Sequence, residues 1–66
     1  MRPELKNLVL TGIWQKQGNL SYWESMICAL ETEGSFPADS IEAVRAFADD
    51  EKKHLEFLLR INRSSD

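Results

Sequence analysis

The sequence has very few cysteine and histidine residues, the types that cross-link a small fold or form a reactive centre. It contains one cysteine, Cys28, which cannot form a disulfide within the chain, and one histidine, His54. A lone cysteine favours a reducing compartment, and we expect Cys28 to be buried, as structural cysteines usually are. The longest apolar run, residues 26–30, is far shorter than the roughly 20 residues that span a bilayer, and no apolar leader follows Met1. These shortages predict a cytoplasmic protein that has no membrane span.

The length of 66 residues allows one domain at most. A domain of this size buries only about 60% of the surface that its unfolded chain exposes, so its stability is marginal. Without disulfides, the remaining sources of stability are a metal ion, an efficient helical core or association with another chain. We therefore expect a single all-α domain over residues 1–66 that pairs with a second copy into a helical-bundle homodimer.

Basic residues are missing from the middle of this acidic chain. Residues 19–40 contain Glu24, Glu31, Glu33 and Asp39 and no lysine or arginine, and the net charge of the whole chain is −3. An acidic segment repels phosphate groups, so we expect no nucleic-acid partner. The same acidic residues would steer the chain toward a basic surface on a partner protein.

Proline and glycine are scarce, and their positions divide the chain into three predicted helices: residues 3–16, 20–33 and 40–62. Pro3 suits a first helical turn, and Gly18 followed by Asn19 is typical of a helix end and a turn. Gly34 predicts the end of the second helix. No Gly or Pro interrupts the third helix, which is expected to be the longest and to end in a frayed tail at residues 63–66.

The residues that we expect to contact a partner are four large apolar side chains: Trp14, Tyr22, Phe57 and Ile61. Aromatic residues are enriched in binding hot spots, and an apolar helix face fits a groove on a partner. The chain has no glycine-rich phosphate loop and no set of residues suited to acid–base or nucleophilic catalysis. The sequence therefore favours a non-catalytic interaction module, such as a regulator, adaptor or inhibitor.

One charged residue falls inside the apolar stripe of the third helix. On a helical wheel of about 100° per residue, the apolar residues of this helix, Phe47 among them, cluster around Glu51. Burying an unpaired carboxylate is strongly unfavourable. Glu51 and His54 form Glu-x-x-His, the pair that places a carboxylate and an imidazole on one helix face in metal-binding bundles. Glu24 is expected at the same height as Glu51 on the neighbouring helix.

The segment from Asp50 to Leu59 resembles the second metal-binding helix of ferritin-like proteins and is most similar to the small encapsulated ferritins. The resemblance implies an iron or manganese site completed across a dimer, with Glu24, Glu51 and His54 as ligands. Two other interpretations of Glu51 stay open. It could belong to a solvated charged run over residues 49–53, or it could pair with a lysine or arginine across a dimer seam.

Overall fold

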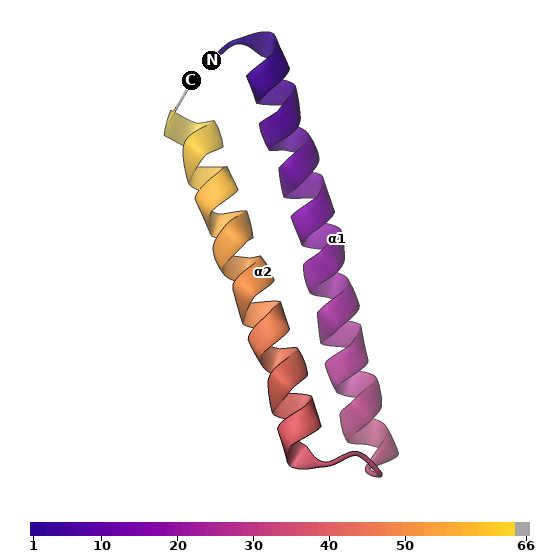
Figure 1. The fold of residues 1–66 in the computed structure, drawn as a ribbon. Helices are drawn as coiled ribbons and strands as arrows, with labels where there is room; N and C mark the ends of the chain where they lie inside the picture. Colours follow the sequence, from indigo (N-terminus) through magenta and orange to yellow (C-terminus); the bar gives the residue numbers. More distant parts are fainter. Residues whose placement is uncertain (65–66) are drawn as a thin grey trace.

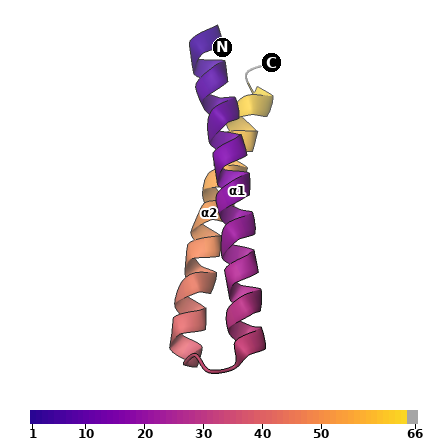
Figure 2. The ribbon, with the colours of Figure 1, turned by 90° about the vertical axis from the view of Figure 1, so that its right-hand side faces the viewer.

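The computed structural model describes residues 1–64 and shows two long helices joined by a short loop (Figure 1). Helix α1 spans Pro3–Glu33, and helix α2 spans Ala38–Ser64. The helices run antiparallel, so the start of α1 and the end of α2 lie at one end of a rod of 49 × 14 × 13 Å. Figure 2 shows that the two helices also cross along this rod. Of the predicted frayed tail, residues 63–64 belong to α2, and residues 65–66 lie outside the described residues.

The expected all-α class is confirmed, but the prediction of three helices is wrong. The predicted helices 3–16 and 20–33 form one continuous helix, α1, with Gly18 and Asn19 in its interior. A glycine inside a helix costs only about 1 kcal/mol relative to alanine. The apolar positions on both sides of Gly18 also keep the same phase, so both halves pack against α2. This packing outweighs the weak preference of Gly18 and Asn19 for a turn.

The ends of the helices follow local sequence signals. Pro3 occupies the start of α1. Gly34 follows its end with a φ of 74°, in the left-handed region that glycine adopts readily, and its N–H donates to the Leu30 carbonyl over 3.2 Å. The predicted end of this helix at Glu33 is thus confirmed. Helix α2 begins at Ala38, two residues earlier than expected.

The seam between the helices follows heptad spacing, with contact positions in alternating steps of three and four residues. The seam positions are Val9, Ile13, Lys16, Leu20, Trp23, Ile27 and Leu30 in α1, and Ile41, Val44, Ala48, Glu51, Leu55, Leu58 and Asn62 in α2. All of them are buried or half-buried. Beside the seam, a Cβ added to Gly12 would lie 3.1 Å from Cδ1 of Leu58, so the two helices approach closely there.

The resulting core is thin. In residues 1–64, only Val9, Val44 and Ala48 are classed as buried, with exposed fractions of 6%, 9% and 9%. Each helix packs against a single neighbour, so most of its circumference faces solvent. Neither helix of the described residues is both long and apolar enough to cross a membrane.

Candidate interaction surfaces

A charged pair lies in the middle of the seam. Nζ of Lys16 lies 3.1 Å from Oε2 of Glu51, and the two side chains are 30% and 18% exposed. Oε2 is buried and makes no hydrogen bond of good geometry to any described residue, so the ammonium group of Lys16 offsets its charge. Glu51 therefore lies in the apolar stripe, as predicted, but pairs within its own chain rather than across a dimer seam. A polar pair in an apolar seam fixes the register of the helices.

An aromatic cluster joins the two helices in the half nearer the loop. The ring centroids of Tyr22 and Trp23 are 5.1 Å apart, and those of Trp23 and Phe47 are 5.2 Å apart. Trp23 is half-buried in the seam, whereas Tyr22 and Phe47 are 57% and 48% exposed. Trp23 therefore belongs to the core between the two helices. The two exposed rings form an apolar surface on one side of the seam.

Residues of α1 extend this surface in both directions along the helix. Positions seven residues apart lie in line along a helix with heptad spacing, which places Leu8 and Ala29 in line with Tyr22. Leu8 is 69% exposed. Met26 lies four residues after Tyr22 and is therefore its neighbour on the helix surface. This side of α1 is apolar at both of its ends.

Residues of α2 extend the same surface beside α1. His54 and Ile61 follow Phe47 at intervals of seven, so the three lie in line. Phe57 borders this line and is half-exposed, with the guanidinium of Arg60 lying 5.5 Å from its ring centroid. Two of the predicted contact residues, Phe57 and Ile61, therefore share one surface with the aromatic cluster.

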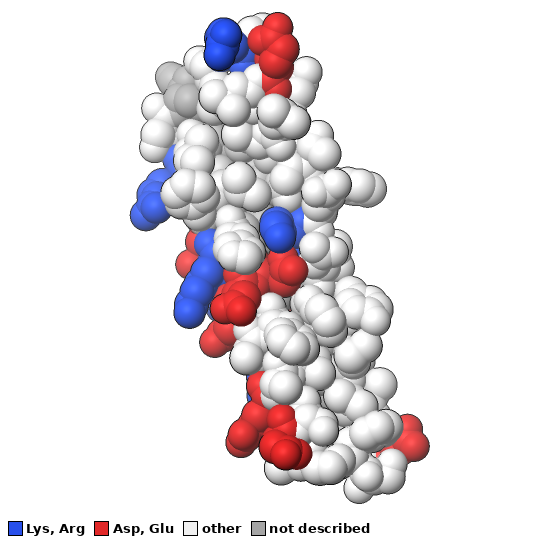
Figure 3. Space-filling model, in the orientation of Figure 1, with Lys and Arg blue, Asp and Glu red and all other residues white. Residues whose placement is uncertain are grey.

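We call this surface the aromatic face, and it comprises Leu8, Tyr22, Trp23, Met26, Phe47, Phe57 and Ile61. Figure 3 looks onto one broad side of the hairpin, where uncharged side chains cover most of the surface. In that view, red acidic groups lie at the top, in the middle and near the lower, loop end, whereas the blue basic groups lie mainly in the upper and middle parts. Phe47 was expected inside the stripe, and its spacing of 14 residues, or two heptads, from Ile61 is the signal that could have placed it on this face.

The opposite side of the seam is charged. Tyr22 and Glu24 flank Trp23 in sequence, and successive residues are about 100° apart, so they lie on opposite sides of the seam. On the Glu24 side, Nη2 of Arg45 lies 3.1 Å from Oε2 of Glu31, and both side chains are about half exposed. Glu24 and Arg45 line a shallow groove there together with Glu42 and Asp49. An exposed ion pair contributes little stability, so this charged face is a solvated surface.

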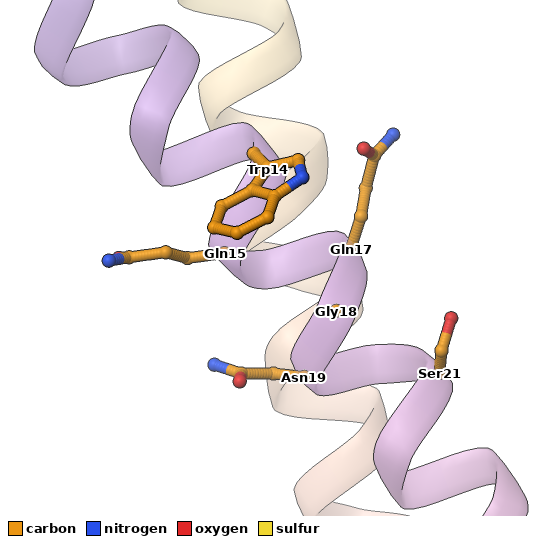
Figure 4. A pocket seen from close by; sticks show the side chains of 6 residues that line it. All are labelled: Trp14, Gln15, Gln17, Gly18, Asn19 and Ser21. Carbon is orange, nitrogen blue, oxygen red and sulfur yellow. The ribbon is translucent and has the colours of Figure 1, made fainter.

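Trp14 lies apart from the other predicted contact residues. Its side chain is 75% exposed and lines an open hollow whose lining residues all belong to α1: Trp14, Gln15, Gln17, Gly18, Asn19 and Ser21. Figure 4 shows the indole lying across the outer side of α1, with α2 behind it. Gln15 and Asn19 project to one side of the helix and Gln17 and Ser21 to the other. We call this surface the outer hollow.

The three candidate metal ligands are not brought together within the chain. Glu51 faces Lys16 in the seam, Glu24 is on the charged face, and His54 is exposed in line with Phe47. Because Trp23 contacts Phe47, Glu24 lies about one and a half turns nearer the loop than Glu51, not at its height. In residues 1–64, no three His, Cys, Asp or Glu side chains are grouped so that they could hold a metal ion.

The free thiol of Cys28 is exposed, so the prediction that it is buried is wrong. The cause is the hairpin itself, because α1 has only one neighbour and Cys28 lies outside its seam positions.

Comparison of this chain with protein-family models, curated proteins and solved structures finds no match.

Proposed function

We propose that this chain is a non-catalytic interaction module, a small regulator, adaptor or inhibitor that presents an apolar helical surface to another protein. The observation that carries the proposal is the imbalance between buried and exposed apolar side chains. Three residues of the described chain are buried, whereas nine large apolar side chains are at least 40% exposed: Met1, Leu5, Leu8, Leu10, Trp14, Tyr22, Phe36, Phe47 and Phe57. Large apolar patches on soluble domains mark interaction sites.

The total accessible surface supports the same proposal. The chain exposes 5002 Å². A compact monomer of its mass, 7.6 kDa, is expected to expose about 4,300 Å². The excess of about 700 Å² is close to the roughly 800 Å² that each partner contributes to an interface of standard size.

Two separate surfaces can take part. The aromatic face offers Tyr22, Phe57 and Ile61, and the outer hollow offers Trp14. Tryptophan and tyrosine are the residue types most often found in binding hot spots, because they bury a large apolar area and retain a polar group. The acidic residues near the loop would favour a partner with a basic surface.

Site-specific photo-crosslinking in cells that make the protein tests this proposal. A benzophenone amino acid replaces Trp14, Tyr22 or Phe57 in turn, and Glu56, an exposed residue outside both surfaces, serves as the control position. We expect adducts of defined mass from at least one of the three test positions and not from position 56. The protein in each adduct is identified by mass spectrometry, and the crosslink is then reproduced with the purified components.

Equal yields at all four positions, or no adduct at any of them, would contradict the proposal. An adduct with a different protein and an adduct with a second copy of the chain both support it, because each assigns the surface to protein binding.

A further inference from the structure

We infer that a second copy of this chain packs on the aromatic face with its loop at the opposite end, forming an antiparallel four-helix bundle. This inference rests on the proposed function and names the occupant of one of its two surfaces. Trp14 lies on the outer side of α1 and stays accessible in such a dimer, whereas Gln15, which lies in line with Leu8 and Tyr22, faces the second copy.

The length of the face limits what can cover it. The Cα trace of the hairpin measures 49 × 14 × 13 Å, so one broad side has a projected area of about 700 Å² before its side chains are added. An occupant has to cover most of the length of this side to approach the roughly 800 Å² per partner of a standard interface. A second hairpin of the same length does so, whereas a short peptide or a single turn of another protein does not.

The distribution of residues along the face is self-complementary. Apolar residues lie toward the chain ends, where Leu8 and Ile61 are found, and toward the loop, where Tyr22 and Phe47 are found. Between them, His54 interrupts the line of α2. A two-fold axis through the middle of the face places apolar groups on apolar groups at both ends, as an isologous interface requires.

Charge decides the relative direction of the two copies. The half of the hairpin next to the loop, residues 19–50, carries seven acidic side chains and one basic side chain. They are Glu24, Glu31, Glu33, Asp39, Glu42, Asp49 and Asp50, with Arg45. The half next to the chain ends, residues 1–18 and 51–64, carries seven basic side chains and three acidic ones. They are Arg2, Lys6, Lys16, Lys52, Lys53, Arg60 and Arg63, with Glu4, Glu51 and Glu56.

Two copies with their loops at the same end would place acidic half against acidic half. Two copies with their loops at opposite ends place each acidic half against a basic half, which favours association and suppresses the parallel arrangement. In the antiparallel arrangement α2 faces α2 of the second copy. When the two copies overlap fully, Phe47 lies within about one helical turn of Phe57 of the second copy. Asp50 then lies near His54 of the second copy.

Sedimentation equilibrium of the purified chain at micromolar concentration tests the identity of the occupant. We expect a mass twice the 7.6 kDa of the chain. Phe47→Glu buries a charge in the interface and should raise the dissociation constant about 30-fold or more, as expected for the loss of a hot-spot residue. The matched control, Ser25→Glu, adds the same charge in the same half of the hairpin, at an exposed position outside both surfaces, and should leave the mass unchanged.

A monomeric wild-type chain would overturn the inference. If photo-crosslinking at Tyr22 or Phe57 then captured a different protein, the proposed function would still stand, so the two failures are distinguishable. Equal weakening by Phe47→Glu and Ser25→Glu would also overturn it, because the interface would not be the aromatic face.

Disulfide trapping tests the direction and does not depend on the Phe47 variant folding. In a Cys28→Ser background, one sample carries Leu8→Cys and another carries Ala29→Cys, both at exposed positions in line with Tyr22. These positions are about equally far from the middle of α1 on either side. The antiparallel dimer predicts a disulfide-linked dimer when the two samples are mixed under oxidation and little in either sample alone. A dimeric chain that forms no mixed disulfide would overturn the antiparallel arrangement.

Discussion

Replacement of Gly18 by alanine tests whether α1 is one continuous helix. Gly18 is exposed in the interior of α1, and a Cβ built at this position meets no atom within 4 Å. The substitution therefore adds no clash and removes the conformational cost of a helical glycine, which is about 1 kcal/mol relative to alanine. For a domain of this size, a gain of 1 kcal/mol corresponds to a rise in melting temperature of about 4–8 °C. Urea unfolding followed by circular dichroism, at one fixed chain concentration, measures the change.

Gly34→Ala is the matched control. Gly34 has the only positive φ in residues 1–64, at 74°, and a left-handed conformation costs a residue with a Cβ about 1–2 kcal/mol. This variant should therefore be destabilised by about that amount. If Gly18→Ala were destabilised as well, Gly18 would be the end of a shorter helix, as the sequence pattern indicated, and the continuous α1 would be refuted.

Two further predictions concern Glu51. The double variant Lys16→Leu/Glu51→Leu should be more stable than wild type by about 1 kcal/mol, because packed apolar side chains often stabilise a seam more than an ion pair does and the Lys16 side chain is still 30% exposed. Lys16→Leu alone should be less stable than the double variant, because it leaves the Glu51 carboxylate without its ammonium partner. Thermal melts of the wild type, the single variant and the double variant measure the difference. The prediction is contradicted if the single variant is the most stable of the three. Added ferrous iron or manganese should leave the melting temperature unchanged, because Glu51 already pairs with Lys16 and lies on a different surface from Glu24 and His54. A rise that His54→Ala abolishes would show that this prediction is wrong.

Much of the local structure could be predicted from the sequence. The start near Pro3, the end at Glu33 before Gly34 and the long uninterrupted final helix all follow from strong local signals. The placement of Glu51 in the apolar stripe also follows from spacing alone. These features depend on residues within a few turns of one another, which is the range over which sequence patterns are informative.

The join between the two predicted N-terminal helices could not be predicted in the same way. The seam passes through Lys16, a charged residue that hides the continuity between Ile13 and Leu20. Gly18 is a weak helix breaker whose effect depends on whether the flanking turns are packed, and that packing is supplied by α2, far away in the sequence. The position of Lys16 in the seam is explained by its ion pair with Glu51 of the opposite helix.

The candidate surfaces could be predicted only in part, because they too depend on contacts between the two helices. Trp14, Tyr22 and Phe57 are exposed, as contact residues need to be, but the sequence does not show that Trp14 lies apart from the other two. That separation depends on how the two helices face each other. The role of Phe47 depends on its contact with Trp23 of the other helix.

The concentration dependence of thermal unfolding tests the central claim most directly, namely that this hairpin is too thin to be stable without a second protein surface. Circular dichroism melts of the purified chain over a hundredfold range of concentration should show a melting temperature that rises with concentration, because dimerisation stabilises the folded chain by mass action. A cooperative melt at one unchanging temperature over the whole range, from a fully helical starting state, would show that the lone hairpin is stable and would contradict the account.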